Sequence, residues 1–154
     1  MSLNDTIIPD KYNPNPTKGV ELIREYRKTK TKKTGAIKAG EILLFNYQAQ
    51  TVERYDKNPI IISLRSSSKH LLAFNVNWLD VKSRDRLIRY LQRVKFHELT
   101  NRQKAQLTLR LRKLNFTQQA YRKYIKKHIR KSFKLNAVDL YMVLRHNLKN
   151  VVDK

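Results

Sequence analysis

The chain has 154 residues, of which 40% are hydrophobic and 9% aromatic, with only three glycines and four prolines. This length and composition predict one domain, or one small domain with an ordered arm, with a real core, and they argue against a low-complexity chain. The 34 Lys and Arg against 12 Asp and Glu give a formal charge of +22, which indicates a protein that binds a polyanion when it functions. The lack of cysteine excludes disulfides, thiol catalysis and Cys-ligated zinc.

Three kinds of polyanion fit this charge: nucleic acid, an anionic membrane surface and an acidic protein. Nucleic acid is the favoured one. No stretch approaches the roughly 20 apolar residues of a membrane span, and Met1–Asp10 lacks the basic start and apolar run of a signal peptide. We therefore expect a protein that works inside a cell, or in an assembly built there, and that has no membrane partner.

The N-terminal part is expected to be an extended arm over residues 1–18, which contain Pro9, Pro14 and Pro16. Residues 19–39 follow as a short amphipathic helix, with apolar positions at 20, 22, 23 and 26, and a basic segment. That segment, Arg27–Gly35, has nothing to bury and is predicted to be a flexible loop that orders on contact with an anion.

Residues 40–79 have the pattern of β-strands. Three short apolar runs predict strands at Glu41–Tyr47, Pro59–Leu64 and Leu71–Val76, the last two pairing as a hairpin across residues 65–70. Three strands make a thin sheet, so at least one helix must cover a face. The predicted fold is therefore α+β: a small antiparallel β-sheet over about residues 40–79, packed by C-terminal α-helices.

Residues 80–154 are expected to be the helical part of a single domain that spans residues 40–154. Ser83 is expected to cap one helix, and Thr100 with Gln103 three residues later forms a capping box for the next. Asn136 is expected to cap a last helix. Between them, residues Thr117–Lys134 place Tyr121, Tyr124, Ile125, Ile129 and Phe133 at a spacing that predicts one apolar stripe of a regular helix.

The opposite face of this predicted helix is entirely cationic. From Leu99 to Val138 there are twelve Lys or Arg and no Asp or Glu, whereas a solvated face intersperses both signs. A membrane-surface helix shares the pattern, but the apolar stripe is needed for the core. We predict nucleic-acid or anion binding by two clusters: Arg27, Lys28, Lys30, Lys32, Lys33, Arg122, Lys123, Lys126, Lys127, Arg130, Lys131 and Lys134.

The expected contacts are with the nucleic-acid backbone and are independent of sequence. Most of these cations are lysines, which bind phosphate as point charges, and no zinc finger, leucine-zipper basic region or RNA-recognition motif is present. Tyrosines at 12, 26, 47 and 55 are possible stacking platforms, although tyrosines in a small domain more often belong to the core.

An enzymatic role is not expected. The acidic residues are scattered singly, so no cluster could hold catalytic metal, and the pairs Glu53/Asp56 and Asp80/Asp85 are interpreted as turn and helix-start residues. His97-Glu98 has no nucleophile at a spacing that indicates a site. We predict no catalytic residue, no metal site and no cofactor.

Four short motifs have a familiar order. They are Gly40-x4-Phe45-x-Tyr47, Tyr55-Asp56-x2-Pro59, Phe74-Asn75-x2-Trp78-Leu79 followed by Arg84, and Tyr121-x2-Tyr124-Ile125-x2-His128-x-Arg130-x2-Phe133. Together they resemble a group of small virion-associated proteins of tailed bacteriophages, some of which are labelled DNA end-protector proteins. The chain departs from the group at Phe74, where a glycine is expected, and after Phe133.

This resemblance implies a bacteriophage virion structural protein at the head–tail junction or in the tail, assembled in the host cytoplasm as part of a multi-subunit assembly with other virion proteins. The residues leave two alternatives open. One is a tail or baseplate subunit that binds only protein, and the other is a cellular RNA-binding protein of ribosomal type.

Overall fold

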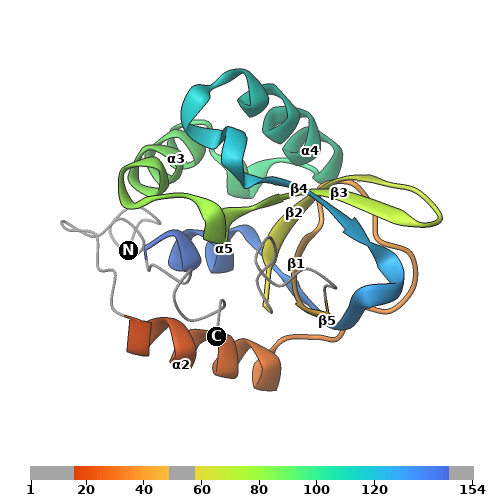
Figure 1. Ribbon diagram of the computed structural model, residues 1–154. Helices are drawn as coiled ribbons and strands as arrows, with labels where there is room; N and C mark the ends of the chain where they lie inside the picture. The colour runs from red at the N-terminus through yellow and green to blue at the C-terminus, as the bar shows by residue number, and fades with distance from the viewer. Residues whose placement is uncertain (1–15, 49–57, 146–154) are drawn as a thin grey trace.

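The computed structural model describes residues 16–48 and 58–145, which form an α+β fold around one antiparallel sheet (Figure 1). The expected fold class is confirmed. In chain order the elements are α2 Pro16–Thr29, β1 Ile42–Tyr47, β2 Ile60–Ser66, β3 His70–Asn75, η1 Val76–Trp78, α3 Val81–Arg93, η2 Phe96–Glu98, α4 Asn101–Arg110, η3 Leu111–Lys113, η4 Asn115–Ala120, β4 Tyr121–Ile125, η5 Lys126–His128, β5 Ile129–Leu135 and α5 Ala137–Leu144, where η is a 3₁₀ helix.

The sheet is strongly curled because its two outermost strands are consecutive in the chain. The strand order is β4-β3-β2-β1-β5, and only the three residues of η5 join β4 to β5. Two hydrogen bonds mark where the edges approach: Ile125 N–H donates to the Tyr47 hydroxyl at 2.9 Å, and Gln48 N–H donates to the His128 carbonyl at 3.1 Å. The sheet is therefore a partly closed barrel.

The inside of the curl holds a small apolar core of its own. Tyr124 of β4 lies edge-on to Phe45 and Tyr47 of β1, with ring centroids 5.3 and 4.9 Å apart. Edge-to-face pairs of this kind add about 0.5–1.5 kcal/mol each beyond their buried area. The cluster contains Leu43, Phe45, Tyr47, Ile61, Leu71, Ala73 and Tyr124, all buried.

The other face of the sheet carries the larger core and is covered by helices. α3, α4 and α5 contribute to it, and α2 adds Ile23 and Tyr26 by packing along α5 (Figure 1). The Tyr26 hydroxyl donates to the Asp139 carbonyl at 3.2 Å, and the Lys30 ammonium group pairs with the Asp139 carboxylate at 2.9 Å. These contacts hold α2 against the domain.

Buried polar side chains connect β3, β4 and α3. Asn75 donates to the Tyr124 hydroxyl at 2.8 Å, while the fully buried Arg84 donates to the carbonyls of Asn77 and Leu79, each at 2.9 Å. Buried donors without partners are costly, so these contacts fix η1 and the start of α3 in place.

Two of the three expected helix caps are confirmed. The capping boxes at Thr100 with Gln103 and at Asn136 with Asp139 are both present. The cap of α3 is Asp80 and not Ser83, because the helix begins at Val81 and its third residue, Ser83, donates its N–H to the Asp80 carboxylate at 2.8 Å. This hydrogen bond holds the pKa of Asp80 below its usual value.

The predicted helix over Thr117–Lys134 is wrong. The segment forms η4, β4, η5 and β5, so the helical part assigned to residues 80–154 also supplies two strands. Short apolar runs fit the period of a helix as well as that of a strand. In β5 burial follows the strand period, because Phe133 and Leu135 are buried and Lys134 between them is exposed. As strands, these residues avoid the stacked like charges of a helix and complete the sheet beside β1 and β3.

The basic segment Arg27–Gly35, expected to be a loop, is a loop only in part. Helix α2 continues to Thr29, and the residues after it pair with the open edge of β5: Lys33 N–H donates to the Ser132 carbonyl and Lys134 N–H to the Thr31 carbonyl, both at 2.8 Å. The last residues of the expected arm, 16–18, are helical, while residues 1–15 lie outside the described residues, as do Tyr12, Tyr55 and Glu53/Asp56.

Two glycines provide a test of the packing between β1 and α4. Gly40 and Gly35 both have positive φ, at +86° and +79°, but a Cβ on Gly40 would overlap the backbone of Asn101, whereas one on Gly35 meets nothing within 4 Å. We expect Gly40→Ala to lower the free energy of unfolding by more than about 3 kcal/mol and Gly35→Ala by about 1 kcal/mol. Urea denaturation of both variants measures this, and equal losses would contradict the close approach.

Candidate anion-binding surface

A groove brings together cations from the two predicted clusters. Arg27 from the last turn of α2 and Lys32 from the segment beside β5 face Arg130 and Lys131 of β5. Asn46, Gln48 and Phe133 complete an open cavity of about 580 Å³. None of the residues that line it is acidic. We call it the basic groove.

The guanidinium group of each arginine in the basic groove donates a hydrogen bond within the protein. The Arg27 guanidinium donates to the Asn58 side-chain oxygen, and the Arg130 guanidinium donates to the Lys127 carbonyl. A guanidinium has five N–H donors, so each retains donors for an anion, in the planar geometry that suits phosphate. Lys32 and Lys131 are exposed and form no ion pair within the described part of the chain.

A β-bulge sets the position of Lys131. Between the pairs Leu44↔Phe133 and Asn46↔Arg130, β5 has two residues opposite one in β1, and Lys131 has a φ of 45°. This left-handed conformation costs a residue with a side chain about 1–2 kcal/mol compared with glycine. Bulges of this type redirect a side chain, and here the redirected side chain is a groove cation.

Three predicted cations are engaged within the protein. Lys30 pairs with Asp139, Lys33 pairs with Glu41 at 2.9 Å with only 9% of its side chain exposed, and Arg122 lies over the Trp78 ring at 4.6 Å. Part of their charge therefore stabilises the fold. Their roles in binding stay predictions.

The remaining predicted cations lie elsewhere on the surface. Lys28 is exposed on α2, and Lys126 and Lys127 form the turn between β4 and β5. Lys134 lines a separate cavity of about 190 Å³ with Gly40, Asn101 and Lys104, where burial lowers the pKa of Lys104. Lys123 lines a third depression, at the β2–β3 hairpin.

That third depression contains residues that the sequence did not single out for binding. It has a volume of about 300 Å³ and is lined by Arg65, Ser67, His70, Leu72 and Lys123. We call it the hairpin pocket. The sequence signal that could have pointed to this pocket is its charge. Residues 58–79, like residues 121–138, contain no Asp or Glu, and they include the cations Arg65 and Lys69.

The described residues contain no group of three or more His, Asp or Glu side chains that could hold a metal ion. His97 lies 4.0 Å from Glu98 and 3.3 Å from the Tyr141 hydroxyl, in a contact that joins η2 to α5. None of the helices in the described ranges is long and apolar enough to cross a membrane.

Comparison of the chain with protein-family models, curated proteins and solved structures finds no match.

The bulge yields a test that separates binding from stability. Lys131→Gly relieves the left-handed strain, so we expect a free energy of unfolding that is unchanged or raised by up to about 1 kcal/mol, together with weaker binding of inorganic polyphosphate. Lys95→Gly is the matched control, since Lys95 has a φ of 54° and is exposed outside the groove. Equal polyphosphate affinity of the two variants in calorimetric titration would exclude Lys131 as a ligand.

Proposed function

We propose that the protein binds the phosphate backbone of DNA in the basic groove, without catalysing a reaction, as a structural component of a tailed-bacteriophage particle. The observation that carries the DNA part is the convergence of Arg27 and Lys32 with Arg130 and Lys131 in a groove that has no acidic lining residue. Four cations held this close repel one another, and an anion bound between them offsets that repulsion.

The ligand chemistry favours phosphodiester over an isolated anion. Neutralising backbone phosphates releases condensed counterions, which supplies most of the affinity of sequence-independent binding. The open groove admits a chain that enters and leaves it, and further cations lie beyond one end of it, in η5 and in the hairpin pocket. No base-reading motif accompanies these cations, so the contact is with the backbone.

The virion part of the proposal rests on the motif order. Its location at the head–tail junction or in the tail, among other virion proteins, comes from the resemblance to small phage proteins. A tail or baseplate subunit that docks an acidic protein, and an RNA-binding protein of ribosomal type, use the same cations. The experiment below separates these alternatives.

Filter binding of duplex DNA of random sequence across a salt series tests the proposal. Four phosphate contacts predict a slope of log affinity against log salt of about −3 to −4, or roughly a hundredfold loss between 50 and 200 mM. The double variant Lys32→Glu, Lys131→Glu should bind at least tenfold more weakly. Lys113→Glu, a charge reversal on η3 outside the groove, should leave the affinity nearly unchanged.

Other results of these experiments overturn the DNA proposal or favour one of the alternatives. Weak binding without a salt slope at low ionic strength overturns the DNA proposal. DNA affinity retained by the double variant, with loss of particle assembly, assigns the groove to an acidic neighbour protein. Enrichment of RNA after crosslinking, with duplex DNA a poor competitor, favours the RNA-binding alternative.

A further inference from the structure

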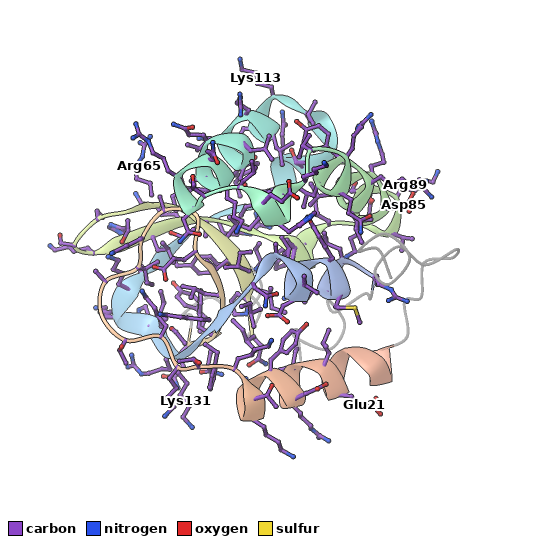
Figure 2. The ribbon with its side chains drawn as sticks, turned by 180° about the vertical axis from the view of Figure 1, so that it is seen from behind. Glu21, Arg65, Asp85, Arg89, Lys113 and Lys131 are labelled. Atoms are coloured by element: carbon purple, nitrogen blue, oxygen red, sulfur yellow. The ribbon has the colours of Figure 1, made fainter. Side chains whose placement is uncertain are left out.

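The basic groove and the hairpin pocket lie at the two ends of one chain segment. Lys123 in β4 lines the hairpin pocket, Lys126 and Lys127 form η5, and Arg130 and Lys131 in β5 line the groove. In Figure 2, Arg65 of the pocket and Lys131 of the groove lie on the same side of the molecule, while Glu21 and the Asp85–Arg89 pair lie on the opposite side.

Hydrogen bonds place η5 between the two cavities. On one side Lys126 N–H donates to the Lys69 carbonyl at 2.9 Å, next to His70 of the hairpin pocket. On the other side Gln48, which lines the basic groove, donates its N–H to the His128 carbonyl at 3.1 Å. The lysines of η5 therefore lie between residues of the pocket and residues of the groove.

The hairpin pocket differs from the groove in its chemistry. Its apolar lining residue is Leu72, which is paired across the sheet with Arg65 of β2 on one side and Lys123 of β4 on the other. His70 lines the same pocket, and its backbone N–H donates to the Ser67 hydroxyl at 3.1 Å, which closes the hairpin. A pocket lined by an aliphatic side chain, an imidazole and two cations suits a nucleobase that is attached to a phosphate.

A base can enter such a pocket only when it is unpaired. In a duplex the base faces are stacked, and extruding one costs a few kcal/mol. Among the described residues, Ile125 is also 38% exposed at the end of β4, directly before the two lysines of η5, and adds apolar surface along the same path.

We propose that a single strand of nucleic acid lies along β4, η5 and β5, with an unpaired base in the hairpin pocket and backbone phosphates on η5 and in the basic groove. This inference rests on the proposed function and names its ligand form. The footprint is on the order of four to eight nucleotides, at the low end for small single-strand-binding folds. The groove and the pocket then act as two subsites for one strand, so that binding in one raises the effective concentration of the strand at the other.

Fluorescence anisotropy with oligothymidylates of about 2 to 15 nucleotides tests the linkage. Affinity should rise at least a hundredfold until the strand spans both cavities and then level off. Arg65→Glu in the pocket and Lys131→Glu in the groove should each weaken binding of the 15-mer at least tenfold and binding of the shortest oligomer about twofold. Lys113→Glu, which makes the same change of charge on η3, is the control, and thermal unfolding of each variant shows whether it is folded.

Two further ligands test whether an unpaired base binds in the hairpin pocket. An abasic strand of the same length, with the same phosphates, should bind the wild-type protein about tenfold more weakly than the normal 15-mer. The Arg65→Glu substitution should reduce its affinity by less than it reduces the affinity of the normal strand. A blunt duplex should lose affinity on Lys131→Glu but little on Arg65→Glu.

The failure of this inference is distinct from failure of the proposed function. A 15-mer that responds to Lys131→Glu and not to Arg65→Glu overturns the two-subsite path and leaves groove binding intact. Equal affinity of abasic and normal strands overturns the base pocket. Absence of salt-dependent binding to any of the strands and the duplex overturns the proposed function itself.

Discussion

The closure of the sheet between β4 and β5 is the constraint on which the other features depend. Because three residues join its two outermost strands, the sheet must curl until Tyr47 and Gln48 at the end of β1 meet Ile125 and His128. The curl encloses the aromatic cluster around Tyr124. It also carries the basic residues of β4 and β5 around a tight corner, which turns a linear run of lysines into a curved surface with a cavity at each end.

Lysines on β4 and β5 have a structural explanation as well as a functional one. Outer strands offer unpaired backbone groups, and lysine side chains there discourage pairing with another molecule. That explanation suits β4. It is weaker for β5, because the segment around Lys32 and Lys33 already covers part of its edge through backbone hydrogen bonds. It does not account for Arg27, which comes from a helix, or for the strained backbone at Lys131. The anion binding that we propose would explain both.

The sequence predicted what depends on neighbouring residues. The β2–β3 hairpin, the capping box at Thr100 and the cap at Asn136 were predictable because each signal lies within a few residues. The helix over residues 117–134 was wrong because Tyr124 and Phe133 fit either period, and only pairing with the distant β1 and β3 selects the strand. The groove brings Arg27 and Lys131 to one cavity, and no local sequence pattern contains that proximity. Most described residues that carry the phage resemblance, such as Phe45, Asn75 and Tyr124, build the core, so the resemblance bears on the fold more directly than on binding.

The pairing of β1 with β5 also has a consequence for how the chain folds. Leu44 and its partner Phe133 are 89 residues apart, so β1 leaves the ribosome long before β5 exists. Until then β2 covers one edge of β1, and the other edge of this Ile-Leu-Leu-Phe strand stays open. Contacts of such high sequence separation form slowly, and an open apolar edge promotes association with other chains. Closure of the curl is therefore a late event in synthesis, and the basic groove cannot exist before it.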